Sequence, residues 1–201
     1  MVDEKSITIS KYLPRSHQPT DLQPIYNGLK IDPSPNNPTS QGLAVLYFAY
    51  GSNMDATQMK ARCPDARVVG LASLNGHVLC FPRRSKTRGC GVSSILAKDG
   101  CETWGVIYEL SDADLVALDR NEGYRQDRDP SNNAYNRITV SVKLDGKRID
   151  AETYVASRQE GVHPPNAGYL AHIRDGAAHH GLPAAYLEYL AGLPHEESAK
   201  S

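Results

Sequence analysis

The sequence predicts an α+β fold built on a mainly antiparallel β-sheet. First, short apolar runs rich in strand-forming residues fill much of residues 44–110. Second, residues 135–156 contain two runs that alternate apolar and polar side chains around an Asp-Gly-Lys turn, which is typical of a β-hairpin. Third, the last helical patterns gather near the C-terminus instead of alternating with strands, so a parallel sheet is not expected. Such a sheet can close into a small barrel flanked by helices.

The composition excludes several classes of protein. With 201 residues and a formal net charge of −1, the chain is expected to lack a nucleic-acid or membrane-surface partner. No apolar run approaches the roughly 20 residues that cross a bilayer, and the N-terminal residues do not resemble a secretory signal. The four cysteines form no Cys-x-x-Cys pair, which argues against a zinc site. A soluble protein of the reducing cytoplasm is expected.

The chain is expected to divide into three parts. Residues 1–42 carry six prolines among Ser, Asn, Thr and Gln residues, a composition typical of an extended or disordered arm. Residues 43–193 have the apolar patterns of a packed domain, and residues 194–201 form a short C-terminal tail.

The packed domain begins with a strand predicted at 44–50 and a short helix that starts after Asn53 and ends before Pro64. Three strands separated by glycine, asparagine and basic loops are expected next, at 66–74, 76–82 and 91–98. A further strand at 102–110 leads into a helix at 111–124, for which Ser111 is a candidate N-cap.

The hairpin follows, with strands at 135–144 and 148–156. Two helices close the domain. One is expected to start at Asn166 and stop at Gly181, and the other has Pro183 near its first turn.

The loop Tyr50-Gly51-Ser52-Asn53 is the first candidate site. A strand that turns through glycine into a helix presents backbone N–H groups without intrahelical partners, and these groups can bind an anion. Gly51 would allow a ligand to approach closely, and Ser52 or Asn53 could cap the helix. The alternative is an ordinary capped helix start.

Glu122 is the second candidate. It lies at the C-terminal end of an amphipathic helix, where the helix dipole opposes a negative charge and raises the pKa of the carboxyl. A carboxyl of this kind is a candidate general base or acid. The alternative is a surface ion pair with Arg120 or Arg125.

Three other motifs are expected to be ordinary structural features and not functional sites. The histidines His172, His179 and His180 lack a metal-binding pattern and indicate a solvated helix end. The basic segment 82–89 could bind a phosphate, but it is more typical of a solvated hairpin loop. Residues 89–94 carry only two glycines of a dinucleotide fingerprint and open a strand, so no Rossmann site is expected.

Taken in order, the motifs resemble the γ-glutamylcyclotransferase family. The matching segments are FAYGSNM at 48–54, RCPDARVVGLASL at 62–74, WGVIYELSDADLVALDRNEGY at 104–124, AETYVA at 151–156, and PPNAGYLAHIRDGAAHHGLPAAYLEYL at 164–190. The resemblance runs from Leu46 to about Leu193 and leaves the proline-rich arm outside.

The resemblance implies a compact α+β fold around a small barrel, with the active site at its mouth. It implies that backbone groups of Tyr50, Gly51, Ser52 and Asn53 hold the substrate's α-carboxylate, and that Glu122 is the catalytic acid or base. Pocket tyrosines of the family are matched by Tyr135, Tyr154 and Tyr169. No metal or other cofactor is implied.

The implied reaction is an acyltransferase- or lyase-type cyclisation. The α-amine of a γ-glutamyl group attacks its own γ-amide and releases 5-oxoproline with an amino acid or amine. The partner would be this small molecule, with no nucleic acid or membrane, and a homodimer is left open. The alternative is a non-catalytic small-molecule binding module on the same fold.

Two departures from the family pattern bear on the pocket. The segment between Glu122 and Tyr135 is longer than in compact members of the family. The rim of the pocket is therefore expected to differ from theirs, and the match of Tyr135 to a pocket tyrosine is less secure. Asn-Met after Gly-Ser, where glutathione-specific relatives have Gly-Ser-Leu, argues against glutathione as the main substrate.

Overall fold

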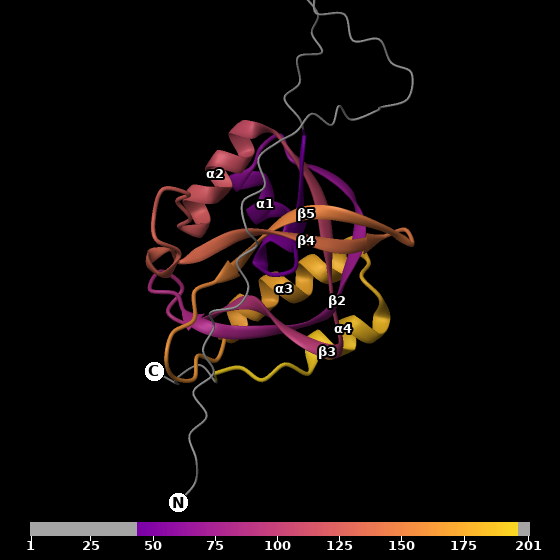
Figure 1. The fold of residues 1–201 in the computed structure, drawn as a ribbon. Coiled ribbons are helices and arrows are strands. Elements are labelled where there is room, and N and C mark those ends of the chain that lie inside the picture. The colour runs from indigo at the N-terminus through magenta and orange to yellow at the C-terminus, as the bar shows by residue number, and fades with distance from the viewer. Residues whose placement is uncertain (1–43, 197–201) are drawn as a thin grey trace, which may run out of the picture. The chain divides into compact units, whose positions relative to one another are not determined.

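The structure is a computed structural model that describes residues 44–196. The expected arm at 1–42 and residues 197–201 of the expected tail lie outside the described residues. Within this range the chain forms five strands, four α-helices and two short 3-10 helices (Figure 1). None of the described helices is long and apolar enough to cross a membrane.

The five strands form a closed barrel in the order β1-β3-β2-β4-β5. The strands are β1 (Val45–Ala49), β2 (Arg67–Arg84), β3 (Gly91–Leu110), β4 (Tyr135–Leu144) and β5 (Lys147–Ala156). Every pairing is antiparallel except that of β1 with β5, which is parallel at Tyr47 and Glu152. The predicted α+β fold with a small, mainly antiparallel barrel flanked by helices is confirmed.

The prediction of four separate strands between residues 66 and 110 is wrong. The glycines taken as breaks lie inside two long strands, where Gly76 and Gly100 adopt φ values of 71° and 74°. The register of β2 against β3 shifts between Asn75 and His77, and pairing then resumes. Glycine permits a left-handed residue in a β-bulge, so the strands bend instead of ending. Beyond the bend they continue as a hairpin with the basic segment 82–89 at its tip.

The helical elements lie between β1 and β2, between β3 and β4, and after β5. They are η1 (Ser52–Met54), α1 (Ala56–Arg62), α2 (Asp112–Glu122), η2 (Pro130–Asn132), α3 (Ala167–His180) and α4 (Ala184–Ala191). Ser111 caps α2 and Asn166 caps α3, because each side chain accepts the backbone N–H three residues on, as predicted.

The start of α1 differs from the prediction. Asp55, and not Ser52 or Asn53, caps this helix by accepting the backbone N–H of Gln58 at 2.8 Å. The reason is that residues 52–54 form the separate turn η1, which places α1 one turn later. The side chain of Asn53 is therefore free to point into the interior, where it is 5% exposed.

The β4–β5 hairpin follows the prediction closely. Its turn residues Asp145 and Gly146 have φ values of 48° and 79°, as a two-residue type I′ turn requires. The predicted apolar face is present in part: Val140, Val142 and Ala151 are buried, whereas Ile138 on the same face of β4 is 40% exposed.

The core fills the barrel and the space between the barrel and the helices. Its fully buried side chains include Phe48, Ile107, Leu118, Leu170, Ile173 and Leu190. Helix α3 packs against η1, β3 and α4, and Figure 1 shows α3 and α4 lying together on one side of the strands. This packing supports the loop that follows β1.

Candidate active site

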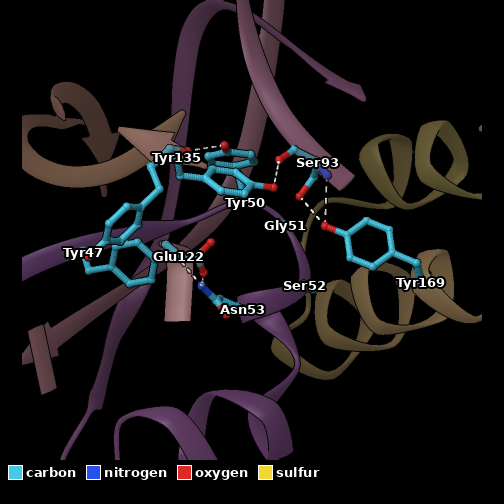
Figure 2. A pocket seen from close by; sticks show the side chains of 10 residues that line it. Tyr47, Tyr50, Gly51, Ser52, Asn53, Ser93, Glu122, Tyr135 and Tyr169 are labelled. Atoms are coloured by element: carbon cyan, nitrogen blue, oxygen red, sulfur yellow. Dashed lines mark hydrogen bonds between the residues drawn. The ribbon is translucent and has the colours of Figure 1, made fainter. Parts of the chain in front are cut away.

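One cavity brings together every residue that the sequence suggested for the site (Figure 2). Its lining residues are Tyr47, Tyr50, Gly51, Ser52, Asn53, Ser93, Glu122, Tyr135, Tyr154 and Tyr169. They come from strands and helices that are far apart in the chain. The cavity has a volume of about 30 Å³, which gives room for a small group such as a carboxylate.

The loop after β1 supplies unpaired backbone donors. The N–H groups of Met54 and Asp55 donate to the carbonyls of Gly51 and Ser52 at 3.0 and 3.1 Å, which closes the turn η1. Within residues 44–196, the N–H groups of Ser52 and Asn53 have no hydrogen-bond acceptor. Unpaired amides at such a turn can bind an anion.

Glycine is required at position 51, because the loop backbone there approaches β3 too closely for a side chain. A Cβ atom at this position would lie 2.2 Å from Oγ of Ser93. The Ser93 hydroxyl lies 2.8 Å from the hydroxyl of Tyr169, and the Ser93 carbonyl accepts the hydroxyl of Tyr135 at 2.9 Å. Ser93 therefore joins the loop to two of the pocket tyrosines, and Figure 2 shows its contact with Tyr169.

The other side of the loop is held by helix α3. A Cβ atom on Gly176 would lie 2.4 Å from the carbonyl carbon of Met54 and 2.6 Å from the nitrogen of Asp55. Only glycine allows the helix to approach the loop backbone this closely. The position of η1 is therefore fixed by α3 as well as by β3.

Glu122 is the last residue of α2, and its side chain is 12% exposed. Its Oε1 accepts hydrogen bonds from Nδ2 of Asn53 at 3.0 Å and from Nη1 of Arg62 at 2.9 Å. Figure 2 shows the bond from Asn53. No residue between 44 and 196 donates to Oε2. One oxygen of the carboxylate is thus held in place, and the other accepts no hydrogen bond from the described residues.

The surroundings of Glu122 change its acidity. Burial raises the pKa of the carboxyl above its ordinary value, and Arg62 and Asn53 offset part of this rise. The C-terminal end of α2 acts in the same direction as burial. A carboxyl with a raised pKa is suited to take up and return a proton near neutral pH.

The alternative interpretation, in which Glu122 pairs at the surface with Arg120 or Arg125, is wrong. The ion-pair partner is Arg62, which sequence reasoning missed, while Arg125 pairs with Asp127 at 2.9 Å. Arg62 ends α1 just as Glu122 ends α2, and the two helices pack together. This meeting of two helix ends leaves no local signal in the sequence.

Asn53 orients the carboxylate through its side chain. Its Nδ2 donates to the hydroxyl of Tyr47 at 2.7 Å as well as to Glu122. Its Oδ1 accepts from Gln58 at 3.1 Å and from Arg62 at 2.7 Å. With both ends of the amide paired, Asn53 and Arg62 hold Glu122 from two directions.

The hydroxyl groups of the pocket tyrosines are uncharged. Burial is the main cause that raises the pKa values of Tyr47, Tyr50, Tyr135, Tyr154 and Tyr169. They can donate or accept hydrogen bonds without bringing charge into the cavity. Tyr47 and Ser93 are lining residues that the sequence analysis did not single out.

The histidines do not gather into a metal site. Among the described residues, no group of three His, Cys, Asp or Glu side chains could hold a metal ion. His172 lies 2.8 Å from a carboxylate oxygen of Asp55, and His180 lies 3.2 Å from the hydroxyl of Tyr108. Two of the three histidines therefore have structural contacts, where the sequence suggested a solvated helix end.

Comparison with known proteins agrees with this architecture. The model of the AIG2-like family matches residues 102–190. The γ-glutamylcyclotransferase of Bos taurus is 32% identical over 157 residues, which cover 76% of this chain and 80% of the relative. The Homo sapiens γ-glutamylcyclotransferase is also 32% identical, over 77% of this chain and 82% of the relative.

A solved structure named as a γ-glutamyl cyclotransferase shares the fold. It has a TM-score of 0.71 and 30% sequence identity, and the match covers 79% of this chain and 92% of that chain. Identity at this level extends over about three quarters of the sequence. The chain belongs to the γ-glutamylcyclotransferase family.

Proposed function

We propose that the protein is a γ-glutamylcyclotransferase, which converts a γ-glutamyl substrate into 5-oxoproline and a free amino acid or amine. Residues 43–193 would form the catalytic unit. The observation that carries the proposal is the state of Glu122, which has one oxygen held by Asn53 and Arg62 and the other free at a cavity beside unpaired loop amides.

The first step is binding of the glutamyl group. The N–H groups of Ser52 and Asn53 would receive its α-carboxylate, which matches both their lack of partners and the small volume of the cavity. Fixing this end orients the α-amine toward the γ-carbonyl of the same molecule. Orientation is the main requirement for an intramolecular reaction, in which effective molarities can reach about 10⁵ M or more.

The second step moves two protons from the attacking nitrogen to the leaving nitrogen. An α-amine with a reference pKa of about 8 is mostly protonated at neutral pH, so a base must remove a proton before attack. Glu122 would take this proton through its free oxygen. The amine nitrogen then bonds to the γ-carbonyl carbon, the γ-amide C–N bond breaks, and Glu122 returns the proton to the leaving nitrogen. The attacking nitrogen loses its second proton through the same carboxylate as the lactam forms, so the released amine leaves as an ammonium ion. No electron transfer is involved.

The direct test is to incubate the protein with γ-glutamyl dipeptides, γ-glutamyl amines and glutathione and to measure 5-oxoproline. We expect product from γ-glutamyl dipeptides and little from glutathione. Absence of product from every substrate would overturn the proposal and favour a non-catalytic binding module.

The pH dependence of kcat/KM should report Glu122. Because the unprotonated carboxylate is the base, activity should fall as pH decreases through an apparent pKa above the ordinary value of 4.5. Arg62→Gln removes a positive charge that lowers this pKa, so the acidic limb should move to higher pH. The α-amine of the substrate also titrates, but the part of the pH profile that reports its pKa should not shift in the variant.

Arg67→Gln is the matched control for this experiment. Arg67 pairs with Glu109 at 3.8 Å, and its side chain is 73% exposed, so its removal should leave the profile unchanged. An acidic limb that does not respond to Arg62→Gln would contradict the assignment of that limb to Glu122.

A further inference from the structure

A second, larger cavity opens directly outside the first. It has a volume of about 730 Å³, and it shares Ser52, Glu122, Tyr135 and Tyr169 with the inner cavity. The tip of the long β2–β3 hairpin forms one wall, so the basic segment 82–89 is not merely a solvated loop. We call this outer cavity the basic vestibule, after the cations that line it: Arg62, Arg83, Arg84, Lys86, Arg88 and Arg120.

The vestibule has an excess of positive charge. Glu122 is the single carboxylate among its lining residues, and Arg62 is paired with it. Arg84 pairs with Glu196 at 3.0 Å at the edge of the cavity. Within residues 44–196, the side chains of Lys86 and Arg120 form neither an ion pair nor a hydrogen bond.

Arg88 connects the vestibule to the inner cavity. Its guanidinium lies 5.0 Å from the centre of the Tyr169 ring and donates a hydrogen bond to Oε1 of Gln58. The amide nitrogen of Gln58 donates in turn to Ser52 at 3.0 Å and to Asn53 at 3.1 Å. Arg88 is therefore held in position before any ligand arrives, which lowers the entropic cost of an ionic contact.

The volumes of the two cavities define where each part of a substrate would lie. The inner cavity is too small for more than a small group, and Glu122 stands where the cavities join. A molecule with its glutamyl end at Glu122 must extend its leaving group into the vestibule. A leaving amino acid with one carboxylate would neutralise only one of the cations there.

We infer that the basic vestibule is a binding subsite for leaving groups with two or more negative charges, such as an acidic amino acid joined through its amine to the γ-carbonyl. This inference rests on the proposed function and adds the substrate class. Lys86 and Arg120 would meet the second charge, while Arg88 would meet the carboxylate nearer the scissile bond. Complementary charge favours both encounter and binding.

Three γ-linked dipeptides test the inference: γ-Glu-Glu, γ-Glu-Gln and γ-Glu-Lys. The first two leaving groups have nearly the same shape and differ by one charge. We expect kcat/KM for γ-Glu-Glu to exceed that for γ-Glu-Gln by about tenfold, with γ-Glu-Lys the poorest. Raising NaCl from about 0.05 to about 0.5 M should reduce the preference, because the contacts are solvent-exposed.

The double variant Lys86→Gln/Arg120→Gln should reduce the ratio of γ-Glu-Glu to γ-Glu-Gln to about threefold or less, mainly through the KM of γ-Glu-Glu. The control Lys147→Gln/Arg148→Gln makes the same change of charge at the exposed start of β5, outside the lining of both cavities, and should leave the ratio as in the wild type. This control separates a local subsite from an effect of total charge.

The outcomes distinguish the two proposals. If γ-Glu-Gln gives 5-oxoproline but γ-Glu-Glu is no better, the subsite inference is overturned and the proposed function stands. A preference that survives the Lys86/Arg120 variant, or that the control variant also abolishes, likewise overturns the subsite. If none of the dipeptides gives product, the subsite inference fails. The proposed function fails as well only if the γ-glutamyl amines and glutathione also give no 5-oxoproline.

Discussion

Glu122→Gln is expected to lower kcat by about 10²–10⁴-fold, the usual contribution of a positioned acid or base. The substituted amide keeps an oxygen that can accept from Asn53 and Arg62, so its position and the fold should be retained. It cannot take a proton from the α-amine. Steady-state kinetics with a γ-glutamyl dipeptide, together with the circular dichroism spectrum of each protein, provide the measurement.

Glu109→Gln is a suitable control for this experiment, because Glu109 lies on the barrel surface and lines neither cavity. It should retain wild-type kcat. A Glu122→Gln protein that keeps more than half of the wild-type rate would rule out Glu122 as the base.

Gly176→Ala is expected to destabilise the protein, although alanine normally stabilises a helix interior by about 1 kcal/mol over glycine. The new methyl group would lie 2.4 Å from the backbone of Met54, so either α3 or η1 must move. Overpacking of this kind costs about 1–3 kcal/mol. Because η1 forms the edge of the cavity, we also expect kcat/KM to fall by at least about tenfold.

Gly168→Ala tests whether this effect depends on position. Gly168 lies in the same helix, but the nearest atom to its Cβ would be Oδ1 of Asn166 at 3.7 Å, an ordinary contact. Urea unfolding should show no loss of stability for this control, and a gain of up to about 1 kcal/mol agrees with the helix propensity of alanine. Equal effects of the two substitutions would contradict the close packing of α3 on the loop.

Much of the fold follows from local rules. The caps Ser111 and Asn166 and the Asp145-Gly146 turn were predictable because each depends on residues within a few positions in the chain. The continuation of the strands through Gly76 and Gly100 was not predictable, because glycine permits either a turn or a bulge. The choice depends on whether a partner strand bends at the same place, and a single strand's sequence does not contain that information.

Some residues of the candidate site could likewise be predicted from the sequence, and others could not. Glu122 and the Gly51 loop could be proposed from the sequence, because a helix end and a strand-to-helix turn have local signatures and because the motifs resemble a known family. Arg62 and Ser93 could not, since each reaches the site only through packing between distant elements. The side chain of Asn53 was suggested as a possible helix cap, but it pairs with Glu122 inside the protein instead. An asparagine side chain can do either, and its own sequence neighbours do not decide which.

The continuous course of β2 and β3 has a consequence for how such enzymes diversify. The same two strands form barrel wall near one end and carry the tip 82–89 at the other. Residues exposed at the tip, such as Lys86, can therefore change without disturbing the buried groups around Glu122. Under the proposed function, exchanging Lys86 and the other exposed residues of the tip for neutral or acidic ones would redirect the protein to new leaving groups while ring closure at Glu122 stayed the same. Arg88 would have to be kept, because it contacts Tyr169 and Gln58.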